Sequence, residues 1–203
     1  MSRATVTAGL TVSVDGYYAG PDDGPERGLG VGGERLHYWV FGGPWTYAGE
    51  HDAGNAEGED EAFLKHSLER CGAVVCGRGT YEAAGAWGGH NPWEVPLFVV
   101  THRVEEQPDP EHGFTFVPDL ATALEQARAA AGDRAINIMG GGTLVREALA
   151  AGVVDELVIS TAPVVLGCGK RLFEGFDHDL DLHKLRVWDS PLATHVAYRI
   201  VPA

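Results

Sequence analysis

The chain has 203 residues, of which 44% are hydrophobic and 22% are charged, and this composition is typical of one globular domain with a substantial core. Its formal net charge of −14 argues against nucleic acids and anionic membranes as partners, because both require a basic protein surface. It contains no apolar run of membrane-spanning length, no signal-peptide pattern at its start and no CxxC pair among its three cysteines. We therefore expect a cytoplasmic protein with reduced thiols.

The first predicted element is a strand at residues 5–14, where hydrophobic residues alternate with small polar ones. Residues 16–33 are rich in glycine and contain two prolines, which predicts a long mobile loop. A short helix is predicted at 34–41. A second irregular stretch at 42–58 then leads to a longer helix at 59–70.

From residue 71 onwards, short apolar strands alternate with helices. Strands are predicted at residues 73–77, 95–101, 114–117, 135–139 and 155–161, and helices at 78–85, 119–131 and 143–151. The last segment, 185–201, is predicted to form two strands joined by a turn at Ser190 and Pro191. The alternation predicts a single α/β domain over residues 1–203, with a mostly parallel central sheet, helices on both faces and an antiparallel C-terminal strand pair.

Three consecutive glycines, Gly140, Gly141 and Gly142, lie between a predicted strand and the helix that begins at Thr143. A tight turn with close packing is one explanation. The other is an anion site, because residues without Cβ let a pyrophosphate approach the N–H groups at a helix N-terminus. The spacing matches neither GxGxxG nor a Walker loop. It therefore predicts a nucleotide-type anion and leaves the nucleotide open.

Two other predicted strands are followed by residues with similar chemistry. These residues are Gly77, Arg78, Thr80, Thr101, His102 and Arg103. An arginine beside a helix start can bind a phosphate through two hydrogen bonds. Because adjacent parallel strands end at the same edge of a sheet, we expect all three strand ends to contribute to one site.

The sequence resembles dihydrofolate reductase, and more fully the C-terminal reductase domain of the riboflavin-biosynthesis deaminase-reductase. Gly-Arg-x-Thr-aromatic-Glu at 77–82, "SVDGYYAGP" at 13–21, the segment 140–173 and the closing strand pair carry this resemblance, which covers nearly the whole chain. It implies a three-layer dihydrofolate-reductase-like fold. It also implies NADPH-dependent reduction of a small heterocycle, related either to 5-amino-6-(5-phosphoribosylamino)uracil or to dihydrofolate.

The resemblance also implies where NADPH binds. Its phosphates would be held by Gly77, Arg78 and Thr80. Its adenosine ribose and 2′-phosphate would be surrounded by Thr101, His102 and Arg103. Its pyrophosphate would lie against Gly140, Gly141, Gly142, Thr143 and Leu144.

Two carboxylates are the catalytic candidates. By resemblance, Glu61, with Asp60 beside it, occupies the place of the important carboxylate of dihydrofolate reductase, although an acidic first turn that complements the helix dipole would look the same. Asp15, which ends the first strand, is the second candidate. The glycine-rich loop that follows it would be a lid over the nicotinamide. Lys170 and Arg171 are candidates for binding a substrate phosphate.

Other functions remain open at this stage. The chain lacks the HxE and PCxxC zinc signature of a deaminase, and the acidic segment 176–183 departs from a calcium loop, so no metal site is expected. A binding or regulatory module on the same fold is one alternative, and a flavin-nucleotide-binding protein is another. Relatives of the riboflavin type pair through their sheets, so we expect a homodimer in which the C-terminal strands, with Trp188 and Tyr198, supply apolar surface.

Overall fold

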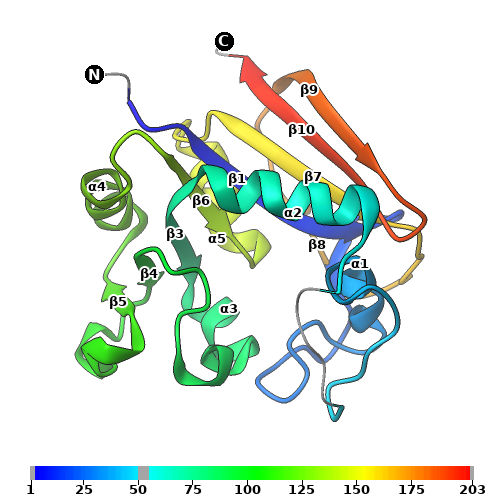
Figure 1. Cartoon of the computed structure of the whole chain (residues 1–203), viewed down its shortest axis with the longest axis horizontal. Helices are drawn as coiled ribbons and strands as arrows, with labels where there is room; N and C mark the ends of the chain where they lie inside the picture. The colour runs from blue at the N-terminus through cyan, green and yellow to red at the C-terminus, as the bar shows by residue number, and fades with distance from the viewer. Residues whose placement is uncertain (1–2, 50–54, 202–203) are drawn as a thin grey trace.

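The computed structural model describes residues 3–49 and 55–201, and its centre is one eight-stranded sheet (Figure 1). The strands are β1 (Val6–Ser13), β3 (Cys71–Gly77), β4 (Leu97–Val100), β5 (Phe114–Val117), β6 (Ala135–Met139), β7 (Glu156–Ala162), β9 (Asp181–Asp189) and β10 (Thr194–Val201). Their order across the sheet is β5-β4-β3-β6-β1-β7-β10-β9. The pairs from β5 to β7 are parallel, whereas β10 pairs antiparallel with both of its neighbours. The predicted sheet is therefore confirmed.

Helices cover both faces of this sheet, as predicted. They are α1 (Tyr38–Phe41), α2 (Gly58–Arg70), α3 (Arg78–Ala83), α4 (Leu120–Ala131) and α5 (Gly142–Ala150). Short 3-10 turns are η1 (Gly33–His37), η2 (Gly85–Gly89), η3 (Val104–Glu106) and η4 (Pro110–His112). Asp119 caps α4 by accepting a hydrogen bond from the N–H of Thr122 at 2.7 Å. No helix in the described residues is both long and apolar enough to cross a membrane.

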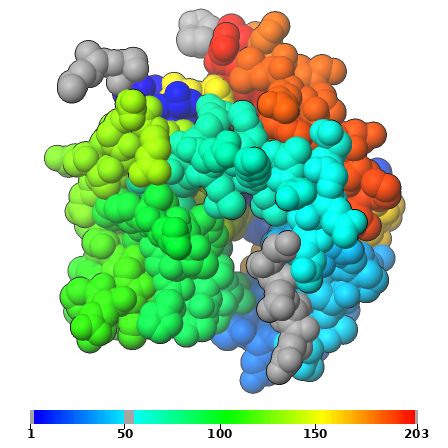
Figure 2. All heavy atoms as spheres, viewed as in Figure 1, coloured from blue at the N-terminus to red at the C-terminus, as the bar shows by residue number. Residues whose placement is uncertain are grey.

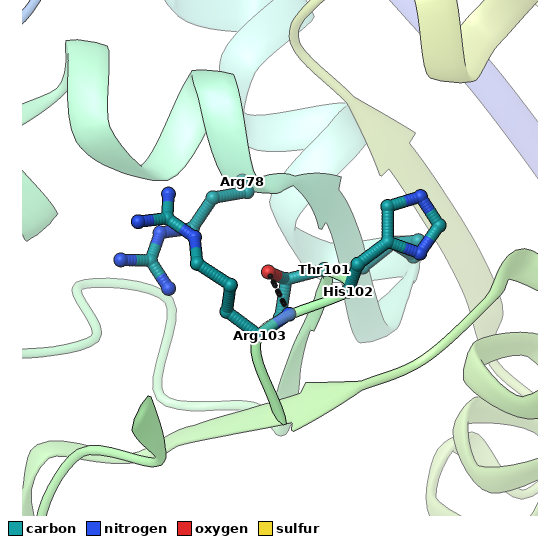
Figure 3. A pocket seen from close by; sticks show the side chains of 5 residues that line it. Arg78, Thr101, His102 and Arg103 are labelled. Atoms are coloured by element: carbon teal, nitrogen blue, oxygen red, sulfur yellow. Dashed lines mark hydrogen bonds between the residues drawn. The ribbon is translucent and has the colours of Figure 1, made fainter. Parts of the chain in front are cut away.

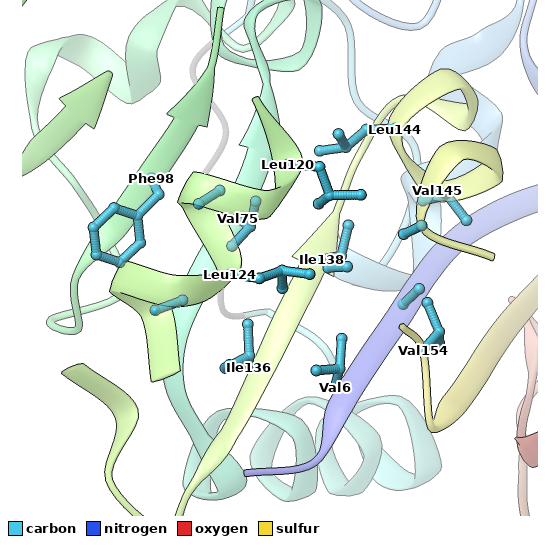
Figure 4. Close-up of a cluster of buried hydrophobic side chains, with 14 of the residues drawn as sticks. Val6, Val75, Phe98, Leu120, Leu124, Ile136, Ile138, Leu144, Val145 and Val154 are labelled. Atoms are coloured by element: carbon cyan, nitrogen blue, oxygen red, sulfur yellow. The ribbon is translucent and has the colours of Figure 1, made fainter. Parts of the chain in front are cut away.

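The main core lies between the sheet and the pair α4 and α5 (Figure 4). Ile136 and Ile138 of β6 are fully buried there, since alternate residues of a strand face the same side. Val75 of β3 faces this core, whereas its neighbours Val74 and Cys76 face a second cluster on the opposite side. A central strand that is buried on both faces explains the unbroken apolar run in the sequence.

On the opposite face, α2 packs over β9 and β10. The third cluster includes Trp39, Phe63 and Trp188, and Trp188 is only 1% exposed. The expectation that Trp188 supplies surface for a partner is therefore wrong. The exposed apolar side chains of β9 are instead Leu182, Leu185 and Val187.

The predicted mobile loop at 16–33 is more regular than its glycine content suggested. It contains a short strand, β2 (Tyr17–Ala19), which pairs with β8 (Lys170–Arg171) in a separate two-stranded sheet. Backbone hydrogen bonds also join Gly20 to Leu29, and Val31 to Pro21, each at 2.8 Å. The irregular stretch predicted at 42–58 lies partly outside the described residues.

Candidate functional site

The carboxyl ends of β3, β4 and β6 meet at one edge of the sheet. β3 lies between the other two, with Gly77 opposite Val100 and Cys76 opposite Met139. The residues at or just after the ends of these strands, including Gly77, Thr101 and Gly140, therefore lie on neighbouring chain segments. This confirms that the predicted strand ends share one edge, which is where α/β sheets bind ligands.

Two of the three consecutive glycines are required by close protein contacts. Gly140 has a φ of +88°, and a Cβ there would overlap the side chain of Thr80. A Cβ on Gly142 would overlap the ring of Tyr18. Gly141 is different, because its Cβ would meet only the Oγ1 of Thr80, at 3.3 Å. Packing thus accounts for Gly140 and Gly142, while a Cβ at the middle glycine would require only a small shift of the Thr80 hydroxyl.

The N-terminus of α5 remains suited to an anion. Thr80 accepts a hydrogen bond from the N–H of Gly141 at 2.7 Å, so its hydroxyl is used within the protein. The next N–H groups, those of Gly142, Thr143 and Leu144, belong to the first turn of α5, where no carbonyl within the helix can accept from them. The side chain of Leu144 is buried in the main core, so only its backbone can face a ligand.

Arg78 and Arg103 share two carboxylates in what we call the arginine–glutamate quartet, with Glu82 and Glu106. Arg78 contacts Glu82 through Nε at 2.8 Å and Glu106 through Nη2 at 2.6 Å. Arg103 contacts the same two residues at 3.0 and 3.5 Å. Burial disfavours the charge of Arg78, but its hydrogen bonds to both glutamates outweigh this effect and raise its pKa. The quartet has two positive and two negative charges.

A cavity of about 250 Å³ borders the quartet, and its lining residues are Arg78, Val100, Thr101, His102 and Arg103 (Figure 3). The Arg78 guanidinium lies 5.0 Å from the ring centroid of Phe116. Its Nη1 is buried and has no hydrogen-bond partner among the described residues. Because an unpaired buried donor is energetically costly, this nitrogen is suited to an acceptor supplied by a ligand.

The three residues after β4 do not act as one group. Thr101 is 6% exposed, and its Oγ1 accepts a hydrogen bond from the N–H of Arg103 at 3.1 Å, so it stabilises the turn. The imidazole of His102 points away from the two guanidinium groups (Figure 3). Of these three side chains, only that of Arg103 belongs to the arginine–glutamate quartet that includes Arg78.

Asp15 holds a neighbouring loop in place. Its carboxylate accepts hydrogen bonds from Ser13 Oγ at 2.6 Å and from the N–H groups of Leu166 and Gly167 at 3.1 and 2.7 Å. The hydrogen bond from Ser13 is the main reason that its pKa falls to about 2. A carboxylate that is ionised over the physiological range is a poor proton donor, which argues against the predicted catalytic role.

Asp60, rather than Glu61, is the acidic residue that α2 turns inward. Asp60 Oδ1 lies 2.9 Å from Nε2 of His195, and its Oδ2 accepts a hydrogen bond from Ser190 Oγ at 2.9 Å. Nδ1 of His195 lies 2.6 Å from Ser160 Oγ. Glu61 is exposed, because successive helical residues point about 100° apart. The structure therefore does not bring Glu61 together with the strand-end residues.

The His195 network is closed to solvent. His195 is 0% exposed and Ser160 is 3% exposed. Burial lowers the pKa of His195 although Asp60 opposes this shift, so the imidazole is neutral near pH 7. Trp39 packs edge-on against the imidazole at 4.5 Å and donates a hydrogen bond to Thr11 at 3.1 Å. The network therefore fixes the segment around Trp39 against β1.

Sequence reasoning did not identify His195, Ser160 or Trp39. The one available signal was weak. Buried and partly buried residues alternate at the start of β10, and His195 lies two residues before the buried Ala197, so both face the same side of the strand.

Figure 2 shows a hollow between the green segments that follow β3 and the blue segments of the first fifty residues. The two basic residues predicted for the substrate side lie on β8, which pairs with β2. Lys170 forms an ion pair with Asp23 at 2.7 Å, and Arg171 lies 4.6 Å from the ring centroid of Tyr17. Both basic side chains therefore already have partners. His37 in η1 is partly buried, and desolvation lowers its pKa to about 4.

Comparisons with known proteins agree with this architecture. A family model described as the RibD C-terminal domain matches residues 4–194. A curated relative, the uncharacterised protein YwjB of Bacillus subtilis, is 29% identical over 127 residues, which are 62% of this chain and 72% of that protein.

Solved structures show the same fold at lower identity. One, described as a riboflavin biosynthesis protein from Shewanella sp. PV-4, is 22% identical, covers 98% of this chain and 99% of its own, and has a TM-score of 0.71. Dihydrofolate reductase from Enterococcus faecalis, complexed with NADP(H) and RAB-propyl, is 15% identical over 97% and 96% of the two chains, with a TM-score of 0.61. A deaminase/5-amino-6-(5-phosphoribosylamino)uracil reductase from Thermotoga maritima is 15% identical over 98% of this chain and 57% of its own, with a TM-score of 0.63.

Proposed function

Because the chain belongs to the RibD C-terminal domain family, we propose that it is an NADPH-dependent reductase of a small heterocyclic substrate of the pyrimidine or pterin type. Two positions suited to anions at neighbouring strand ends support this proposal. One is the N-terminus of α5, and the other is the pair Arg78 and Arg103 beside the cavity. NADPH carries a pyrophosphate and a 2′-phosphate, so it needs two such positions.

Thr80 supports the idea that the two positions serve one ligand. Thr80 lies two residues after Arg78 in α3. Its hydroxyl accepts a hydrogen bond from the N–H of Gly141, next to the first turn of α5. A single hydrogen bond thus fixes the spacing between the arginine pair and the α5 N-terminus. That arrangement suits one extended dinucleotide better than two unrelated anions.

When bound, NADPH supplies the hydride. The N–H groups of Gly142, Thr143 and Leu144 would bind its pyrophosphate with the favourable end of the helix dipole. Arg103 and Arg78 would bind the 2′-phosphate. Tyr18, whose ring lies beside Gly142, would bring the ordered 16–33 segment next to this site and so help to exclude water from it. Neither Glu61 nor Asp15 has the surroundings of a proton donor, so an ordered water is the better candidate for the proton.

Titration of the purified protein with NADPH, NADH and free flavins tests this function. We expect NADPH to bind about tenfold more tightly than NADH, since a charge-assisted contact to the 2′-phosphate contributes about 1.5 kcal/mol. Equal affinities would contradict the role given to the two arginines.

Tight flavin binding, with a yellow protein on purification, would favour the flavin alternative. NADPH binding with no oxidation across a panel of pyrimidines and pterins would favour a binding module.

We also propose a homodimer that forms through β9. This strand pairs only with β10 among the described residues, and Leu182, Leu185 and Val187 are 41, 38 and 44% exposed. An edge strand with exposed apolar side chains is suited to pairing with another chain. Light scattering at micromolar concentration should give twice the mass of 21.6 kDa. Replacement of Val187 by lysine should give the monomer mass.

A further inference from the structure

The two arginines proposed to bind the 2′-phosphate already have carboxylate partners. Arg78 contacts Glu82 and Glu106, and Arg103 contacts the same two carboxylates. A planar guanidinium binds carboxylates and phosphates through the same N–H groups. A phosphate that binds more of these guanidinium groups than the unpaired Nη1 of Arg78 must therefore compete with carboxylates of this chain.

Glu106 is the easier of the two to displace. Glu82 lies four residues after Arg78 on α3, so the helix itself keeps this pair together. Glu106 belongs to a different element, η3, and its side chain is 43% exposed. Rotation of the Glu106 side chain into solvent would free Nη2 of Arg78 without moving a helix.

The position of Glu106 is nevertheless well defined. Its neighbour Gln107 binds the edge strand β5 with both ends of its amide: Nε2 donates to the carbonyl of Phe116 at 3.3 Å, and Oε1 accepts from the N–H of Phe116 at 2.7 Å. The N–H of Glu106 also binds the carbonyl of Arg103 at 3.2 Å. These contacts hold the turn so that the Glu106 carboxylate stays within reach of the guanidinium groups.

We propose that Glu106 is a specificity-determining residue of this site: its carboxylate occupies the guanidinium groups that a 2′-phosphate requires, and so it limits the preference for nucleotides that carry this group. The proposal rests on the proposed function, because it concerns the same adenosine end of the cofactor. A nucleotide without a 2′-phosphate leaves the ion pairs in place. A nucleotide with one must displace Glu106, and the repulsion between carboxylate and phosphate adds to this cost.

Calorimetric titration with adenosine 2′,5′-bisphosphate and with adenosine 5′-monophosphate tests the proposal, since these probes differ only at the 2′ position. Glu106→Gln keeps the shape of the side chain but removes its charge. We expect it to bind the bisphosphate about threefold to tenfold more tightly than wild type does. The affinity for the monophosphate should change by less than about twofold.

Glu105→Gln is the matched control. Glu105 lies on the same turn, is exposed and makes no ion pair among the described residues. This variant has the same change in net charge, so a general electrostatic effect would strengthen bisphosphate binding equally in both variants and would overturn the proposal. Weaker bisphosphate binding by Glu106→Gln would also overturn it, because Glu106 would then act only by positioning Arg78.

The two proposals fail in different ways. If wild type binds NADPH but Glu106→Gln shows an unchanged ratio of the two probes, the role of Glu106 is wrong and the proposed function stands. If neither wild type nor the variants bind either probe or NADPH, the cofactor assignment fails, and the role of Glu106 fails with it. An unchanged melting temperature of Glu106→Gln confirms that the variant is folded.

Discussion

The N–H of Gly141 donates a hydrogen bond to the hydroxyl of Thr80 across 2.7 Å, although 61 residues separate the two in the chain. This bond joins the start of α5 to the start of α3, and thereby the ends of β6 and β3. It explains why a threonine follows Arg78 at this spacing. It also makes Gly141 the position where ligand binding and protein packing can be tested separately.

Gly141→Asp should abolish NADPH binding and leave the protein folded. Its φ of −48° is accessible to any residue, and an added Cβ would lie 3.3 Å from Thr80 Oγ1, a contact that a small shift of this hydroxyl relieves. A carboxylate there would repel the pyrophosphate at the helix N-terminus by several kcal/mol. Melting curves with and without NADPH measure this effect. A mutant that keeps the full ligand-induced shift would show that the cofactor binds elsewhere, and Gly141→Ala controls for the added Cβ.

Gly140→Ala should lower the stability of the fold but leave NADPH binding intact. The φ of +88° and the overlap with Thr80 mean that alanine strains the fold, at a cost of about 1–3 kcal/mol in the free energy of unfolding. Urea denaturation of wild type and mutant gives this number. A mutant as stable as wild type would mean that the turn relaxes without cost. The fraction that remains folded should still gain stability from NADPH.

Asp60→Ala should destabilise the protein by about 2–4 kcal/mol, because it leaves His195 and Ser190 without their buried acceptor. Glu61→Ala, one residue along the same helix, should change the free energy of unfolding by less than about 0.5 kcal/mol, since Glu61 is exposed. Denaturation of the two variants at pH 7 compares them directly. If Glu61→Gln lowers the turnover number while Asp60→Asn does not, the resemblance-based role of Glu61 would be restored.

His37 should make the protein sensitive to mild acid. Its pKa is about 4 in the folded protein and about 6.5 in the unfolded chain, so the unfolded state binds more protons between these values. Stability contributed by the neutral imidazole is complete above pH 6.5 and is lost as the pH falls towards 4. Because His37 is only partly buried, we expect a loss of about 1–2 kcal/mol. His37→Gln should flatten the pH dependence of the melting temperature over this range, and an unchanged slope would contradict the assignment.

Local patterns were enough to predict the sheet and the shared edge. The apolar run at Val74 and Val75 indicates a central parallel strand, and the rule that parallel strands end at one edge predicts that Gly77 and Gly140 lie close together, as the structure shows. The Asp119 cap followed from residue type alone. These features depend on neighbours in sequence or on topology.

Contacts between distant side chains were not predictable in this way. Three consecutive acidic residues lie in the first turn of α2. Which of them faces inward depends on how the helix is rotated relative to β10, and the structure shows that it is Asp60, which contacts His195, 135 residues away. The same holds for Glu106, whose pairing with Arg78 depends on how the turn η3 packs against β5. The predicted mobile loop at 16–33 was misjudged because its partner strand, β8, lies about 150 residues later and is only two residues long.

The two edges of the sheet differ in a way that limits how chains can assemble. On β5, the amide of Gln107 occupies the N–H and carbonyl of Phe116 in the manner of a neighbouring strand. In the proposed homodimer, pairing through β9 on a two-fold axis would use that edge of each chain and leave the β5 edges, where Gln107 occupies Phe116, at the two outer ends. An edge strand whose backbone groups are already bonded is a poorer template for a further chain, so this arrangement would favour a closed dimer over fibres.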